Sequence, residues 1–210
     1  MKIKGYEIAP NVNLGGANLE GADLTGADLT EANLTEANLR EANLNGAELR
    51  EANLSWASLR EANLTDANLR GADLGWASLE GANLTDAYLG GASLRGANLT
   101  DAYLRGANLR EANLRGADLR GAKYSVFAIL QANLGELPEK LTAELMEWDA
   151  HATPNPGKFM EWKQGGECPA QEHLRIFQFE ENRELFRQGK PTMTLWELWV
   201  AVAKELEIKI

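Results

Sequence analysis

The sequence predicts a coiled all-β solenoid followed by a small all-α domain, and three observations support this fold class. Alanine and leucine each return every five residues over more than half of the chain. A period of five suits neither a helix nor a straight strand, so the backbone itself must turn. After residue 135 the period is lost and helix signals replace it. A chain of 210 residues is long enough for two such parts.

The period of five sets the shape of the solenoid. Every fifth residue from Ala17 to Ala122 is alanine, and every fifth from Leu14 to Leu119 is leucine, 22 of each without a break. Five residues turn an α-helix by about 500°, so successive leucines share no face. In a straight strand an odd step sends every second leucine to the wrong side. The leucines share one interior only in a tube with flat sides and regular corners.

The repeated unit reads A-(N/D)-L-x-x, as in "ANLTE", "ANLRE", "ADLTG" and "ANLRG". Over residues 13–134 this motif resembles that of the pentapeptide-repeat family. The resemblance implies a right-handed quadrilateral β-helix with four pentads in each coil. In that fold the leucine and the alanine two residues before it point inward, and the other three positions face outward.

The sequence agrees with a coil of twenty residues. Trp56 and Trp76 occupy the same repeat position twenty residues apart, and "LTDA" recurs at the same distance. Asn or Asp fills 16 of the 22 positions just before a leucine. Because these side chains bond to nearby backbone in tight turns, we expect them to support the bends of each coil.

The ends of the solenoid need covering, because an open coil exposes apolar core and unpaired strand edges. Near the carboxyl end the repeat weakens: Tyr124 and Ile129 take leucine positions and Phe127 takes an alanine position. We expect these large side chains to plug the last coil. The predicted domains are an amino-terminal cap at 1–12, the solenoid at 13–135 and the helical domain at 136–210.

Helix signals begin at Pro138. "KLTAELMEW", ending at Trp148, places its apolar residues on one helical face, and "NPGKFMEW" begins with Asn155 as an N-cap. "LRIFQFEENRELF" is a third helical segment. The last, "TLWELWVAVAKEL", begins with Thr194 as an N-cap, and its apolar residues cover about 200° of the helical wheel. One side of this helix meets its own domain, and the rest requires the solenoid or another protein.

Composition excludes several classes of partner. The net charge of −10 argues against nonspecific binding to nucleic acid or to anionic membranes, which are themselves negative. One cysteine, Cys168, rules out an intramolecular disulfide framework and fits a reducing compartment. The chain shows neither a signal peptide nor an apolar run of membrane-spanning length. We therefore expect a cytoplasmic protein.

Aromatic residues are the main candidates for contact with a partner protein, since tryptophan and tyrosine are enriched at binding hot spots. Trp56 and Trp76 are expected to stack on one outer face of the solenoid, unless the helical domain folds over them. Two outward tyrosines and the last helix complete the set of partner-binding candidates: Trp56, Trp76, Tyr88, Tyr103, Trp196 and Trp199.

Metal, cofactor and catalytic sites are not expected. The residues suited to metal binding are Asp149, His151, Cys168 and His173, and no C-x-x-C or H-x-x-x-H spacing joins them. We expect them to be structural. The repeat contains no histidine or cysteine, and a regular tube leaves no pocket for a small-molecule substrate.

The resemblance implies a noncatalytic scaffold that binds another protein, with a homodimer as one expected assembly. Some pentapeptide-repeat proteins imitate duplex DNA and bind DNA gyrase through an acidic surface. Here acids exceed bases in residues 1–66, eleven against five, but balance them in residues 67–122, six against six. Arg105, Arg110, Arg115 and Arg120 fall on different sides of the coil. DNA mimicry, with binding to DNA gyrase or another DNA-binding protein, is therefore the alternative. A third interpretation is that the regular repeat reflects a consensus or engineered chain.

Overall fold

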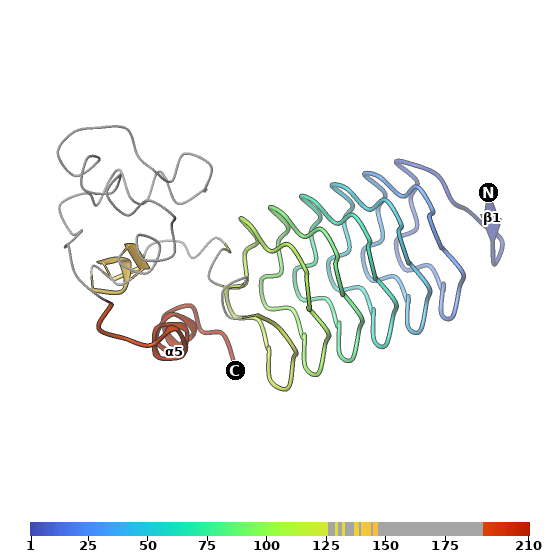
Figure 1. The fold of residues 1–210 in the computed structure, drawn as a ribbon. Helices are drawn as coiled ribbons and strands as arrows, with labels where there is room; N and C mark the ends of the chain where they lie inside the picture. The colour runs from blue at the N-terminus through green and yellow to red at the C-terminus, as the bar shows by residue number, and fades with distance from the viewer. Residues whose placement is uncertain (126–128, 130–131, 133–136, 139, 144, 147–190) are drawn as a thin grey trace, which may run out of the picture. The chain divides into compact units, whose positions relative to one another are not determined.

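The computed structural model describes residues 1–125, 129, 132, 137–138, 140–143, 145–146 and 191–210 (Figure 1). The chain divides into two compact units. The first contains Met1–Asn133 together with Leu206–Ile210, and the second contains Leu134–Glu205. The last five residues, predicted as part of the helical domain, therefore belong with the solenoid.

A short hairpin begins the chain. Strands β1 (Lys2–Ile3) and β2 (Tyr6–Glu7) pair antiparallel. Lys4 and Gly5 join them with φ angles of 50° and 86°, and two positive φ angles are typical of a two-residue hairpin turn. Ile8 follows with an exposed fraction of 4%. The hairpin and the buried Ile8 side chain lie at the amino end of the solenoid, where the sequence predicts a cap.

The solenoid has four pentads in each coil. Parallel bridges pair the residue before each leucine with its equivalent twenty positions on, from Asn13 with Asn33 to Tyr103 with Lys123. Figure 1 shows the coils stacked in sequence order. The predicted four-sided coil is confirmed. Each side carries one bridging residue instead of an extended strand, because two of every five residues form a corner. The right hand of the coil stays a prediction from the family resemblance.

Each corner is a tight turn with one residue in the left-handed region. The alanine N–H donates to the carbonyl of the leucine three residues before it, as from Ala17 to Leu14 at 2.9 Å. The residue immediately before the alanine has a positive φ in every pentad, for example 67° at Gly16 and 57° at Glu31. Positive φ at the third residue is the mark of a type II turn. The chain thus turns once per pentad, as the period requires.

The core consists of the two inward columns that the motif predicts. Along the uninterrupted repeat the leucines, and the alanines from Ala17 to Ala117, have exposed fractions between 0% and 4%; the last alanine, Ala122, is half-buried. The residues before the leucines support the corners, as expected of Asn and Asp. Asn33 accepts hydrogen bonds from the Thr35 N–H at 3.1 Å and from its hydroxyl at 2.7 Å. The predicted role of these polar residues in the bends is confirmed.

The predicted end plug lies partly within the described residues. Ile129 is fully buried, and its carbonyl accepts the Ala132 N–H at 2.9 Å, as a leucine carbonyl does in the repeat. Tyr124 is half-buried. Other predicted features lie outside the described residues: Phe127, Trp148, Asp149, His151, Asn155, Cys168 and His173.

Helix α5 (Leu195–Glu205) is the predicted last helix. Thr194 caps it: its Oγ1 accepts the Glu197 N–H at 3.2 Å, and its own N–H donates to the Glu197 carboxylate at 2.7 Å. This reciprocal pair is a capping box. In the part of the chain that is described, no helix is long and apolar enough to cross a membrane.

Candidate protein-binding surface

Trp56 and Trp76 form an exposed stack on one corner of the solenoid. Their ring centroids lie 5.6 Å apart with an interplanar angle of 13°, so the predicted stacking is confirmed. The two side chains are 61% and 53% exposed. The far face of Trp76 rests on the backbone of Gly96, where an added Cβ would come within 2.6 Å of the ring. The indole edges therefore face outward while the stack itself is held in place.

Both tryptophans sit at the left-handed corner position, with φ angles of 62° and 60°. Elsewhere in the solenoid this position holds Gly, Glu, Asp or Asn. A left-handed conformation costs a residue with a Cβ about 1 kcal/mol, and it is an outlier for a bulky side chain. Two exposed indoles at strained positions contribute little to the core, so their presence points to contact outside the solenoid.

Small side chains flank the tryptophan pair within its own two coils, whereas Glu36 and Arg95 lie in the coils before and after. Ser58 and Ser78 follow the two tryptophans on the adjoining side of the coil, and Ser55 and Gly75 precede them. Beyond the serines the next corner carries an ion pair, in which Arg60 and Glu80 lie 3.0 Å apart and are both exposed. An apolar centre with a polar rim is typical of protein interfaces. We did not predict these small neighbours, although the parallel "SWAS" and "GWAS" segments carry the signal.

Tyr88 and Tyr103 face away from the tryptophan corner. Tyr88 lies twelve residues after Trp76. Because a full coil takes twenty residues, this spacing places Tyr88 on the opposite half of the coil. The tyrosines are 51% and 43% exposed. The ammonium of Lys123 lies 4.1 Å from the Tyr103 ring centroid, in a cation–π contact. The structure therefore does not gather the predicted solenoid aromatics into one surface.

The two predicted tryptophans of α5 have opposite environments. Trp199 is fully buried, as is Leu198, so it is a core residue and not an exposed anchor; this corrects the prediction for Trp199. Trp196 is 55% exposed and Val200, one helical turn further on, is 41% exposed. These two residues form the outward apolar spot of α5. Contact of this helix with the solenoid or another subunit stays a prediction.

Several charges on the solenoid form ion pairs. Arg40 pairs with Glu41 at 3.1 Å, and both side chains are about half exposed, at 47% and 52%. Such exposed pairs contribute little each. Among the described residues the most enclosed carboxylate is Asp118, which accepts hydrogen bonds from Arg120 at 2.6 and 2.9 Å. These bonds lower the pKa of Asp118, although its partial burial acts in the opposite direction.

Metal ligands do not cluster in the described part of the chain, where no three His, Cys, Asp or Glu side chains converge. The candidates that the sequence offered lie outside it. The described surface offers a stacked aromatic pair and paired surface charges, which suit recognition of another macromolecule.

Comparison with known proteins identifies the repeat. Residues 11–46, 47–86 and 87–123 match the family model of pentapeptide repeats, with 8 copies, and together they make up more than half of the chain. No match to a curated protein is found.

Several solved structures resemble the chain, among them three cyanobacterial proteins. HetL of Nostoc sp. strain PCC 7120, a pentapeptide repeat protein involved in heterocyst differentiation regulation, is 36% identical over 54% of this chain and 62% of HetL, with a TM-score of 0.33. The match thus spans less than two thirds of HetL. Alr5209 of Nostoc PCC 7120 is 40% identical over 48% of this chain and 82% of its own, with a TM-score of 0.42. Rfr23 of Cyanothece 51142 is 31% identical over 59% of this chain and 88% of its own, with a TM-score of 0.36.

Proposed function

The chain belongs to the pentapeptide-repeat family, and we propose that it is a noncatalytic scaffold that binds another protein through the Trp56–Trp76 stack. The observation that carries this proposal is the exposure of two stacked indoles at left-handed corner positions. Conformational strain without a structural benefit is found mainly where a residue serves function. The single cysteine favours placing this scaffold in the cytoplasm.

The surroundings of the stack fit a partner with an apolar anchor. Tryptophan supplies a large contact area at low cost in side-chain entropy, and hot spots cluster where such residues are enclosed by neutral contacts. The small side chains of Ser58 and Ser78 leave the indole edges open to a side chain of the partner. The Arg60–Glu80 ion pair would lie at the rim, where charged groups affect specificity more than affinity.

Affinity capture tests the proposal directly. The full chain, a Trp56→Ser/Trp76→Ser variant and a Tyr88→Ser/Tyr103→Ser variant would each be used to capture proteins from a lysate of the source organism. We expect a partner retained by the wild type and the tyrosine variant and lost from the tryptophan variant. A partner that the tryptophan variant retains in full would refute the assignment of the surface.

The second exposed aromatic, Trp196 on α5, gives a further arm of the same experiment. A Trp196→Ser variant removes its apolar spot without touching the solenoid. Loss of the partner from this variant, with full retention by the Trp56→Ser/Trp76→Ser variant, would place binding on the helical unit and make the solenoid a spacer.

The alternative, imitation of DNA toward gyrase, is favoured by one observation. Six exposed carboxylates occupy corner positions in the amino-terminal half: Glu31, Glu36, Glu41, Glu51, Glu61 and Asp66. They lie on all four corners of the coil, whereas a mimic needs negative potential along one face. If this alternative holds, the chain inhibits supercoiling by gyrase and loses the effect as salt rises. Absence of inhibition at low salt would remove it.

A further inference from the structure

The last five residues, Leu206–Ile210, form what we call the closing pentad. Lys209 bridges Asp118 in parallel, as each pentad of the repeat bridges the pentad one coil further on. The Leu119 N–H donates to the Lys209 carbonyl at 2.7 Å, and the Lys209 N–H donates to the Ala117 carbonyl at 3.0 Å. The residue that a continuous repeat would place here is Pro138, which has no N–H to donate. The closing pentad therefore supplies a missing side of the last coil.

The closing pentad copies the repeat in conformation as well as in pairing. Glu207 has a φ of 58°, like the corner residues of the solenoid. Ile208, in register with the inward Ala117, has an exposed fraction of 6%. The Leu206 carbonyl accepts the Gly116 N–H at 2.9 Å, just as the Arg115 carbonyl accepts the Gly96 N–H at 2.9 Å.

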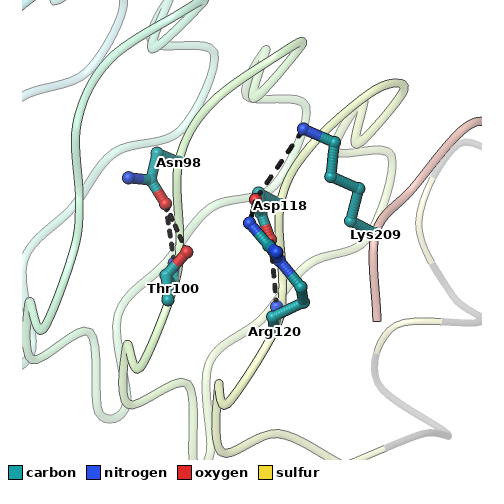
Figure 2. Close-up of polar contacts among 5 residues, drawn as sticks. All are labelled: Asn98, Thr100, Asp118, Arg120 and Lys209. Atoms are coloured by element: carbon teal, nitrogen blue, oxygen red, sulfur yellow. Dashed lines mark hydrogen bonds and ion pairs between the residues drawn. The ribbon is translucent and has the colours of Figure 1, made fainter.

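One side-chain contact adds selectivity to these backbone bonds. Asp118 has an exposed fraction of only 9%. Its carboxylate is fixed by Arg120 and lies 3.8 Å from the Lys209 ammonium (Figure 2). A lysine at this register is therefore attracted to the edge, and an acidic residue would be repelled.

We propose that the edge formed by Gly116–Leu119 is a binding site for an extended pentad, and that it can take the closing pentad of a second copy of this chain. A strand edge with free N–H and carbonyl groups is a template for added strands. Along the sequence, a separate compact unit, Leu134–Glu205, lies between this edge and the pentad that fills it. Release of this pentad breaks the backbone bonds and the ion pair described above, whereas the bridges between the other pentads do not involve it.

A second copy is the partner that the chemistry selects. It carries the same left-handed corner residue, the same inward isoleucine and the same lysine in the register that Asp118 recognises. Exchange of identical segments between copies is a low-cost route to a symmetric dimer, because the hydrogen bonds that break within one chain form again between two chains.

Two complementary full-length variants test the exchange. Ile208→Asp disables the closing pentad and leaves the edge intact, whereas Asp118→Lys disables the edge and leaves the pentad intact. We expect each variant alone to be monomeric by size-exclusion chromatography with light scattering, and their equimolar mixture to contain a heterodimer. A control mixture combines Asp118→Lys with the double variant Asp118→Lys/Ile208→Asp. Neither chain in this mixture has a competent edge, so both should stay monomeric. A mixture of the first two variants that stays monomeric would overturn the proposal.

A labelled peptide with the sequence of residues 202–210 separates the edge from the exchange. It should bind the Ile208→Asp variant, raise its melting temperature, and lose binding when Asp118→Lys is added. If Ile208→Asp does not fold, Lys209→Glu serves in its place, since it repels Asp118 without entering the core. Peptide binding without a heterodimer would show a peptide site and reject the second copy; loss of both would reject the site.

Discussion

Each pentad turns two side chains into a narrow core, and Ala67 shows how little space the alanine column leaves. It is fully buried, as are all inward alanines from Ala32 to Ala102. We predict that Ala67→Leu overpacks the coil and lowers the free energy of unfolding by about 1–3 kcal/mol. Urea denaturation followed by circular dichroism measures the change.

The outward neighbour of Ala67 provides a matched control. Asn68 bridges Tyr88 one coil further on, so a tyrosine is already accepted at this repeat position. Asn68→Tyr should destabilise less than Ala67→Leu. It loses the hydrogen bonds of Asn68 with Glu48 and with the Arg70 N–H, about 1 kcal/mol, but does not overpack the core. Equal losses for Ala67→Leu and Asn68→Tyr would contradict the assignment of inward and outward positions.

Gly96 fixes the tryptophan stack from beneath. Its φ is +66°, and an added Cβ would approach the Trp76 ring to 2.6 Å. Gly116, with φ +71°, would meet nothing closer than 3.9 Å. We predict that Gly96→Ala destabilises the solenoid more than Gly116→Ala, which carries only the left-handed cost of about 1 kcal/mol. Thermal unfolding of both variants checks this, and an equal effect would mean that Trp76 does not rest on Gly96.

Among the elements, helix α5 depends on its capping box. Removal of the Thr194 hydroxyl leaves the Glu197 N–H without its side-chain acceptor. We predict that Thr194→Ala costs about 1 kcal/mol of helix stability, while the conservative Thr194→Ser costs much less. Hydrogen exchange of the first amides of α5 gives the measurement. Unchanged exchange in Thr194→Ala would show that the cap is not formed in solution.

The sequence predicts these elements unequally well, for physical reasons. The coil follows from the periodicity, because each pentad pairs with another only twenty residues away and all pentads obey the same pattern. The cap at Thr194 is equally local. The wide apolar arc of α5, however, leaves open which of its tryptophans is buried, because the choice of Trp199 over Trp196 depends on tertiary packing.

The closing pentad is the element that sequence reasoning missed. "LEIKI" contains no alanine, asparagine or leucine at the repeat positions, and its pairing partner lies far away in the chain. The alternation of apolar and charged residues indicates a strand, but it does not show that this strand pairs with Gly116–Leu119. Likewise, the strain at Trp56 and Trp76 becomes visible only in the backbone angles.

At the scale of the whole molecule, carboxylates link stability to pH. Hydrogen bonds from Thr25, Thr30 and Arg120 lower the pKa values of Asp23, Asp28 and Asp118. A group with a depressed pKa stabilises the folded state above its unfolded pKa and loses this effect as pH falls through the folded pKa. We therefore predict a melting temperature that falls as pH drops below about 4.

The Asp118→Asn variant is the control for this pH dependence. Because it removes one of the carboxylates with a lowered pKa, its melting temperature should fall less steeply in acid than that of the wild type. A wild-type melting temperature that rises as pH falls below about 4 would contradict the sign of these shifts.

Connectivity also belongs to this scale. The chain leaves the solenoid after Asn133, forms the unit Leu134–Glu205, and returns with Leu206. The unit Leu134–Glu205 is thus inserted in the chain between two pentads of the first unit.

The central claim is that a partner protein contacts the tryptophan corner, and site-specific photo-crosslinking tests it most directly. A benzoylphenylalanine placed at Ser58, beside the Trp56–Trp76 stack, samples that corner. The same probe at Asn68 samples the opposite half of the coil. The account predicts an adduct with a protein partner from position 58 in cells of the source organism, and none from position 68. Adducts from position 68 alone, or the same adduct from both positions, would contradict it.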